Sequence, residues 1–194
     1  MRKRCFIDVE TTGLDPVKNG IVQISGMIDV EGKPQKYFDY SCKPMAGDEI
    51  EEAALKVHGI RDFSNLEHPL DVYTSLKVLL SNYVNQYDKQ DKFTFIAYNA
   101  KFDYDFMRAW FNKCGDKYFG SFFWFPPVCV MIMAMWYLED KRSMLNNFKL
   151  MTVAKFMGIT VDESKLHDSL YDIKITREVY DRLTNMIKKG KEVS

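Results

Sequence analysis

Apolar residues in alternating and continuous runs predict β-strands in the first part of the chain. Three such runs cover residues 4–10, 21–29 and 37–43. Turn-forming residues separate them, Asn19-Gly20 in the first gap and residues 31–34 in the second. Sequential strands with short connections are typical of an antiparallel arrangement. We therefore expect the chain to begin with a three-stranded antiparallel meander.

Helical spacing of apolar residues dominates the rest of the chain. The longest examples are residues 70–84, which follow Pro69, and residues 169–189, which precede Gly190. Residues 93–98 are instead typical of a buried strand. Shorter helices are expected at residues 50–57, 102–114, 129–138 and 147–157. The pattern predicts an α/β fold with a mixed central sheet, in which parallel strands follow the meander and helices cover both faces.

Composition narrows the class of protein. The 194 residues are 46% hydrophobic and carry no net charge, and no linker or repeat divides them, so we expect a single domain over residues 1–194. The four cysteines are widely spaced without a CxxC pair, which excludes a zinc ribbon and a disulfide framework. No apolar run approaches membrane-spanning length. A cytoplasmic protein that binds no membrane is the expectation.

Asp8 and Glu10 interrupt an otherwise apolar strand. They are two residues apart, so both carboxylates lie on one face of the sheet. Two buried like charges repel each other unless a cation compensates them, and oxygen ligands suit a divalent ion. The alternative is a solvated face at the end of the strand, where neighbouring acids are harmless.

Asp103 follows the second buried strand directly. It lies at the junction between the strand at residues 93–98 and the helix at residues 102–114. Ligands gather at the carboxyl ends of strands in α/β sheets, so this position favours a functional carboxylate. Its alternative role is to cap the helix that it opens.

A third set of polar residues lies at the start of the last helix. Asp172 extends the apolar stripe that continues through Leu183, so the helix carries it inward, where an unpaired charge is costly. Asp168, four residues earlier, shares that face if the helix already includes it and is then a rival ligand. His167 precedes the first turn and is either free to enter a cleft or a surface residue. Acids from two strands and a helix, with one histidine, fit a two-metal site with a general base.

Three segments resemble the motifs of a known family. They read Phe-Ile-Asp-Val-Glu-Thr-Thr-Gly-Leu-Asp-Pro at residues 6–16, Ala-Tyr-Asn-Ala-Lys-Phe-Asp at 97–103 and His-Asp-Ser-Leu-Tyr-Asp at 167–172. Their order is similar to that of the DEDDh branch of the DnaQ-like 3′–5′ exonucleases, which includes the proofreading subunit of bacterial DNA polymerase III. The resemblance implies a ribonuclease H-like fold and hydrolysis of the 3′-terminal phosphodiester, with release of nucleoside 5′-monophosphates.

The resemblance also implies roles for individual residues. His167 becomes the general base, and Asp168 is demoted. The implied ligands of two Mg²⁺ or Mn²⁺ ions are Asp8, Glu10, Asp103 and Asp172, which with His167 form the catalytic set. The implied substrate-binding residues around the 3′-terminal nucleotide are Thr11, Thr12, Gly13, Leu14, His58 and Asn99.

The motifs do not encode the sugar of the substrate. We expect 3′ ends of single-stranded or frayed DNA, as in proofreading or repair, with an exoribonuclease that trims RNA 3′ ends as the alternative. A catalytically silent nucleic-acid-binding subunit is a third reading, which the complete set of carboxylates and histidine disfavours. Whether a DNA polymerase or replication protein is a partner is left open by the sequence.

Two features depart from the family pattern, and the charge of a third segment bears on how the substrate is held. Tyr98 occupies a position where many members have histidine, and the aromatic run Phe122–Pro127 matches no family pattern, so it is either core or a surface on which bases stack. Residues 141–194 carry eleven basic and seven acidic residues, an excess that surrounds the third motif. A strand held at its end through bound metals predicts a shallow dependence of binding on salt.

Overall fold

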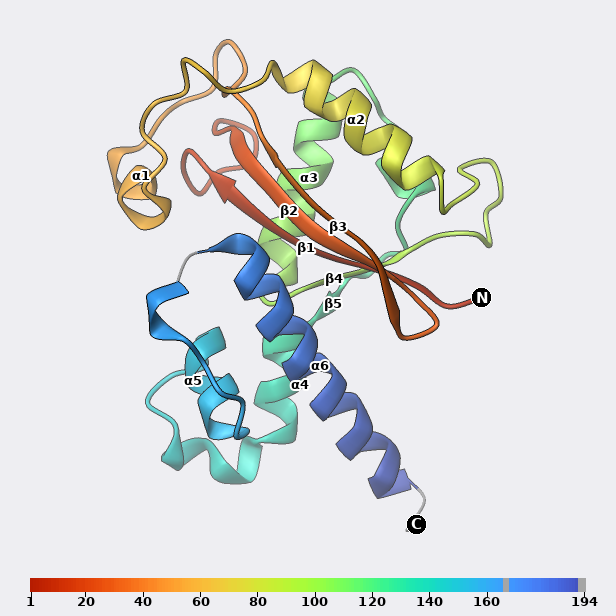
Figure 1. Ribbon diagram of the computed structural model, residues 1–194, viewed down its shortest axis with the longest axis vertical. Coiled ribbons are helices and arrows are strands. Elements are labelled where there is room, and N and C mark those ends of the chain that lie inside the picture. Colours follow the sequence, from red (N-terminus) through yellow and green to blue (C-terminus); the bar gives the residue numbers. More distant parts are fainter. Residues whose placement is uncertain (166–167, 192–194) are drawn as a thin grey trace.

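The computed structural model describes residues 1–165 and 168–191, and its centre is a five-stranded sheet in the order β3-β2-β1-β4-β5 (Figure 1). β2 pairs antiparallel with both β1 and β3, whereas β1 and β4, and β4 and β5, pair in parallel. The predicted mixed sheet with an initial meander is confirmed. The strands are β1 (Lys3–Thr11), β2 (Ile21–Val30), β3 (Lys33–Ser41), β4 (Thr94–Ala97) and β5 (Val128–Cys129).

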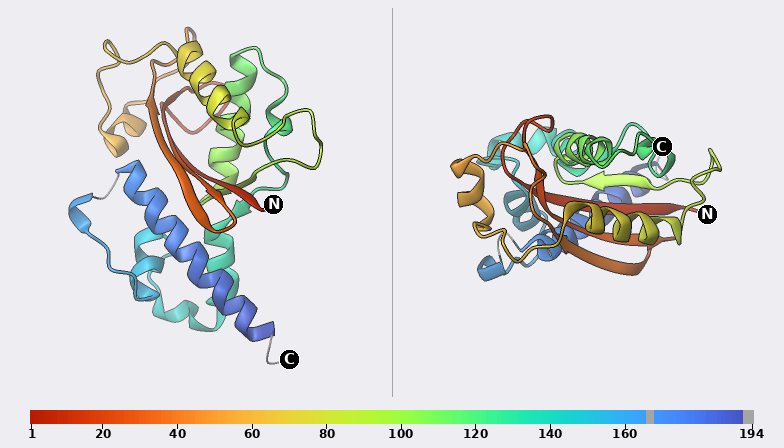
Figure 2. Two further views of the ribbon diagram at one scale, coloured as in Figure 1. Left: turned by 45° about the vertical axis from the view of Figure 1, so that its right-hand side comes forward. Right: turned by 90° about the horizontal axis from the view of Figure 1, so that it is seen from above.

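Helices cover both faces of the sheet, as the hydrophobic pattern predicts. The two buried clusters place α2 and α3 on one face and α4, α5 and α6 on the other (Figure 2). No helix among the described residues is long and apolar enough to cross a membrane. The helices are α1 (Glu52–His58), α2 (Pro69–Ser81), α3 (Ala100–Lys113), α4 (Val130–Tyr137), α5 (Leu150–Phe156) and α6 (Ser169–Lys191).

Side chains along β1 alternate between the two faces of the sheet. Cys5, Ile7 and Val9 pack into the cluster with α2 and α3. Phe6 packs into the opposite cluster, where its ring meets the edge of Tyr180 on α6 at 5.6 Å between centroids. With a period of two, the even positions that follow Phe6 continue the face that α6 covers.

Several elements differ from the sequence prediction. α2 ends at Ser81 rather than at residue 84, and α5 spans Leu150–Phe156 rather than residues 147–157. β3 begins at Lys33 rather than at residue 37, because its first five residues are exposed on an edge strand and carry no apolar alternation. The sequence does not predict β5, because two residues are too short for any periodicity and the apolar pattern extends the following helix back to Cys129. α6 continues past Gly190 to Lys191, so this glycine does not end the helix.

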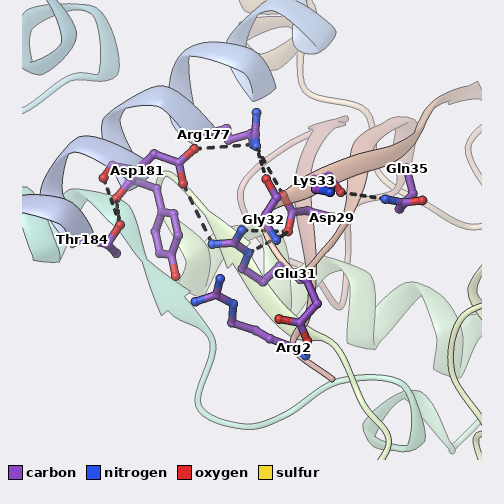
Figure 3. Close-up of polar contacts among 11 residues, drawn as sticks. Arg2, Asp29, Glu31, Gly32, Lys33, Gln35, Arg177, Asp181 and Thr184 are labelled. Atoms are coloured by element: carbon purple, nitrogen blue, oxygen red, sulfur yellow. Dashed lines mark hydrogen bonds and ion pairs between the residues drawn. The ribbon is translucent and has the colours of Figure 1, made fainter. Parts of the chain in front are cut away.

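A buried ion-pair cluster fastens α6 to the start of the sheet (Figure 3). Arg4 on β1 donates two hydrogen bonds to the fully buried Asp29 on β2, at 3.0 and 2.7 Å. Arg177 on α6 donates to the Gly32 carbonyl at 3.0 Å and reaches the other Asp29 oxygen at 3.4 Å. Removing one member of a buried pair typically costs about 3–5 kcal/mol. The cluster thus fixes the position of α6 against β1 and β2.

Candidate active site

The two carboxylates of β1 lie at the end of the sheet where the parallel strands β1 and β4 have their carboxyl ends. β1 and β4 pair only as far as Phe6 and Ile96, and β4 ends at Ala97. Asp8 and Glu10 therefore lie beyond the end of β4 on the side that α6 covers. The pairing of β1 with β2 shifts register directly after Glu10, and such bulges are frequent beside active sites.

Asp103 reaches β1 from the first turn of α3. Its side chain is buried, and its Oδ1 accepts a hydrogen bond from the Val9 backbone N–H at 3.2 Å. This bond holds the carboxylate against the backbone of β1 at Val9, the residue that separates Asp8 from Glu10. The capping role considered from sequence is not observed, because the N-cap of α3 is Asn99, without a side-chain cap hydrogen bond.

Asp172 comes from the first turn of α6, and Asp168 does not share its role. The Asp168 carboxylate accepts a hydrogen bond from the Tyr171 N–H at 3.1 Å and is exposed, so it caps the N-terminus of α6. Ser169 fixes the same turn, because its hydroxyl lies 2.6 Å from that of Ser25 on β2. Ser25 pairs directly with Asp8 across the strands. The buried Ser25–Ser169 contact thus brings the start of α6 to the level of Asp8.

The pKa values show that the four carboxylates form one electrostatic cluster. Burial raises the pKa of Asp8 well above its ordinary value, and the charges of Asp103, Glu10 and Asp172 raise it further. Burial first, and then Asp172, raises the pKa of Glu10 to about 7. Burial also raises the pKa of Asp103 to about 7, with a further contribution from Glu10 and an opposing one from the Val9 hydrogen bond. The charged forms of Asp8, Glu10 and Asp103 are therefore destabilised first by burial and then by the neighbouring carboxylates.

The chemistry of this donor set suits hard divalent cations. Carboxylate oxygens are the ligands that Mg²⁺ and Mn²⁺ prefer, and a cation would relieve the repulsion that raises the pKa values. Within residues 1–165 and 168–191, no three His, Cys, Asp or Glu side chains are arranged so that they could hold a metal ion as they stand. The carboxylates would therefore have to move closer together around an ion, and the ion would neutralise their mutual repulsion.

His167 lies outside the described residues. The chain is described up to Lys165 and again from Asp168, which caps α6. The general-base role of His167 therefore stays a prediction from the third motif.

The loop after β1 uses its polar side chains to hold its own shape. Thr11 Oγ1 donates to the Gly13 carbonyl at 2.7 Å, and Thr12 Oγ1 donates to the Glu49 carbonyl at 2.6 Å while accepting from the Gly20 N–H at 2.9 Å. A Cβ on Gly13 would lie 2.3 Å from the Glu51 side chain. The two hydroxyls and the tight fit at Gly13 shape the loop that carries Leu14, which is 78% exposed, while the predicted substrate-binding role of Thr11, Thr12 and Gly13 stays a prediction.

A pocket of about 270 Å³ opens between this loop and the start of α3. Leu14 and Asn99, both predicted to bind substrate, lie on its wall. Phe102 and Phe106 form the apolar side, with their ring centroids 4.7 Å apart. The remaining lining residues are Pro16, Lys101 and Asp105. The lining residues include none of the four carboxylates, but they come from the loop after β1 and from the start of α3, the elements that carry Asp8, Glu10 and Asp103.

His58 supports the loop from α1 and does not line the pocket. Its Nδ1 accepts from the Ile60 N–H at 3.1 Å, so Nε2 carries the proton and faces the Thr11 carbonyl at 3.2 Å. Burial lowers the pKa of His58, although the hydrogen bond to Thr11 opposes this shift. A neutral His58 thus joins the end of α1 to the loop that carries Leu14.

The two departures from the family pattern have separate structural explanations. The Tyr98 hydroxyl donates to the Phe148 carbonyl at 2.5 Å, which ties the end of β4 to the segment before α5. In the aromatic run, Phe122 and Phe123 are buried in the core, whereas Phe125 is 75% exposed and packs against Tyr104. The core reading is thus confirmed for Phe122 and Phe123, whereas base stacking on the exposed Phe125 stays a prediction.

Positioning residues behind the loop escaped the sequence prediction. Asn19 is buried, and its side chain accepts from the Asp15 N–H at 2.9 Å and donates to the Glu49 carbonyl at 3.0 Å. Lys113, at the end of α3, donates to the Asn19 carbonyl and to Asp48, each at 2.6 Å. The available signal was the Asn19-Gly20 turn, whereas nothing in the spacing pointed to Lys113.

Comparison with known proteins decides the family. The RNase_T family, described as exonuclease, matches residues 5–180. The chain belongs to this exonuclease family. Its predicted membership of the DnaQ-like 3′–5′ exonucleases is thereby confirmed, and the match covers all three motifs.

The relatives agree with this assignment. The chain is 26% identical over 196 residues to ribonuclease T of Buchnera aphidicola, covering 94% of this chain and 83% of that protein. It is also 26% identical over 183 residues to the PolC-type DNA polymerase III of Thermotoga maritima, where it spans only 12% of the polymerase.

Solved structures show the same fold. The structure of E. coli exonuclease I in complex with a dT13 oligonucleotide superposes with a TM-score of 0.74 at 18% identity, over 100% of this chain and 43% of that one. A zinc-bound form of the exonuclease I complex with single-stranded DNA gives a TM-score of 0.74, covering 97% of this chain and 43% of that one. The predicted ribonuclease H-like fold is confirmed.

Proposed function

We propose that the protein is a metal-dependent 3′–5′ exonuclease that removes nucleoside 5′-monophosphates from single-stranded nucleic acid, with DNA 3′ ends as the expected substrate. The observation that carries the proposal is the cluster of Asp8, Glu10, Asp103 and Asp172. The loop after β1 and the start of α3, next in sequence to three of these acids, also line a partly apolar pocket, which would take a nucleotide's base and sugar.

The four carboxylates would hold two Mg²⁺ or Mn²⁺ ions. Bound divalent ions at such a site lower the pKa of water and stabilise negative charge on a leaving oxygen. Asp103 is oriented for this role by the Val9 N–H, and the neighbouring acids favour cation binding because each loses an unfavourable charge interaction. Leu14 and Phe102 would pack against the terminal nucleoside, and His167 would accept the proton of the attacking water.

RNA is the second candidate substrate, and a specific observation favours it. Several relatives that match nearly the whole chain are named ribonuclease T, whereas the exonuclease I structures contain DNA oligonucleotides. The pocket does not separate the two sugars. The preference for DNA rests on the resemblance of the motifs to a DNA proofreading subunit and on the DNA oligonucleotides in the exonuclease I structures.

One comparison tests the activity and the sugar together. Wild-type protein, Asp8→Asn and Asp172→Asn are incubated with single-stranded DNA and RNA of the same sequence, with Mg²⁺, with Mn²⁺ and with a chelator. The proposal predicts metal-dependent release of nucleoside 5′-monophosphates by the wild type alone, faster from DNA. Faster release from RNA would show that RNA is the preferred substrate and would leave the proposed mechanism unchanged. Undiminished release by folded Asp8→Asn would contradict the proposed metal site.

A further inference from the structure

A groove continues from the nucleotide pocket along α3. The pocket shares Pro16 and Asp105 with a second hollow of about 380 Å³, so the two are contiguous. The second hollow lies between the loop at Pro16-Val17 and the exposed side of α3. Its further lining residues are Arg108, Ala109, Asn112, Lys117, Phe119 and Gly120.

The spacing of residues along α3 explains why one side of the helix follows the groove. Lys101, Asp105, Arg108 and Asn112 recur at intervals of four, three and four residues, so they occupy one helical face. The 14 residues of α3 extend over about 21 Å at about 1.5 Å per residue. Several nucleotides fit along this length, since stacked nucleotides rise by about 3.4 Å each.

The charges along this face suit a phosphate backbone. Lys101 and Arg108 share Asp105 as their ion-pair partner, at 2.5 and 3.9 Å. Their side chains are 87% and 60% exposed, and exposed pairs of this kind contribute little stability, so either cation can turn to a phosphate at low cost. Lys117 adds a third, exposed cation at the far end. Three cations against one carboxylate leave the groove positive.

We propose that this α3 groove binds the backbone of the substrate strand on the 5′ side of its terminal nucleotide. The inference rests on the proposed function and extends it from one nucleotide to a strand. Continuity with the pocket favours the same strand over a separate partner. Three phosphate contacts correspond to a salt slope of about −2 for a single strand, which agrees with the shallow dependence expected from the sequence.

The test is the length dependence of binding. The double variant Arg108→Ala/Lys117→Ala is compared with wild type and with Lys33→Ala/Lys36→Ala, a control that removes two exposed cations from β3, at the other edge of the sheet. Affinities for fluorescent single strands of two to eight nucleotides are measured by anisotropy in a chelator, which prevents hydrolysis. Exposed substitutions of this kind change stability little, so all variants are expected to fold.

In wild type and control, affinity is expected to rise with length up to about six nucleotides. In the groove variant this rise is lost, with a fall of about tenfold or more for the octamer and a shallower salt slope. The same length dependence in all three proteins would contradict the proposal that the α3 groove binds the strand. Hydrolysis with Mg²⁺ is assayed separately, so a protein without turnover would refute the proposed function while the length series still decides the groove.

Discussion

The Oδ1 of Asp103 accepts a hydrogen bond from the Val9 N–H at 3.2 Å, at the level where β1 has passed the end of β4. Because β4 no longer supplies a partner there, the carboxylate on α3 takes the place of a neighbouring strand. One side chain thus satisfies the backbone of β1 and carries a negative charge into the acidic cluster. The same contact fixes the distance between the motif on β1 and the motif at the start of α3.

Two substitutions at Asp103 separate its structural and chemical roles. Asp103→Asn keeps a carbonyl oxygen for the Val9 N–H, whereas Asp103→Ala leaves this buried donor unsatisfied. We expect Asp103→Asn to be more stable than Asp103→Ala by about 1–3 kcal/mol in urea unfolding without metal. Both should lose at least about 100-fold in turnover, since both remove a proposed metal ligand. Equal stability of the two variants would show that the hydrogen bond contributes nothing.

The raised pKa of Glu10 predicts a specific pH dependence of stability. Its pKa rises from 4.5 to about 7 on folding, so the folded protein binds more protons than the unfolded chain between these values. The contribution of Glu10 to stability therefore falls as the pH rises through this window. We expect metal-free Glu10→Gln to gain stability over wild type from pH 5 to pH 8, and Mg²⁺ to reduce that gain. A gain that is constant with pH would contradict the shift.

His58 predicts a pH dependence of stability opposite to that of Glu10. Its pKa is lowered in the fold, so its contribution to stability is present above about pH 6.5 and is lost as the pH falls through the folded-state pKa. We expect His58→Ala to cost about 1–2 kcal/mol at pH 8, with a raised KM because the Thr11 loop loosens. Val57→Ala, at a neighbouring exposed position, is the matched control. The difference from wild type should narrow by pH 5, and a widening difference would refute a neutral, bridging histidine.

Leu14 offers a test of the nucleotide pocket that leaves the fold alone. Its side chain is 78% exposed, so Leu14→Ala should change the free energy of unfolding by less than about 0.5 kcal/mol. Loss of its contact with a bound nucleoside should raise KM by about tenfold, which corresponds to one or two buried CH₂ groups. Val17→Ala, exposed on the same loop, should have a smaller effect on KM for a dinucleotide. Equal KM values for wild type and Leu14→Ala would place the nucleotide elsewhere.

The sequence predicted the carboxylate cluster because its positions follow from short-range rules. A period of two sets Asp8 and Glu10 on one face, and the end of a buried strand positions Asp103. The competition between Asp168 and Asp172 needed the structure, since only the start of α6 at Ser169 shows that Asp168 is a cap. The resemblance to the family had demoted the same residue.

Contacts between segments that are distant in the sequence could not be predicted from it. The Ser25–Ser169 contact joins residues 144 positions apart, and Lys113 reaches Asn19 across 94 positions. No periodicity encodes such pairs, because each depends on how α6 and α3 pack on the finished sheet. The two-residue strand β5 could not be predicted for a different reason: only its pairing with β4 defines it as a strand.

End-blocked substrates test the central claim most directly. A single-stranded oligonucleotide labelled at its 5′ end is offered with a free 3′-hydroxyl or with a blocked 3′ terminus, in Mg²⁺ or Mn²⁺ and in a chelator. The account predicts a ladder of shortened products and nucleoside 5′-monophosphates only from the free 3′ end, only with the metal, and not with Asp8→Asn. Degradation of the 3′-blocked strand, or digestion that persists in the chelator, would contradict a metal-dependent 3′–5′ exonuclease.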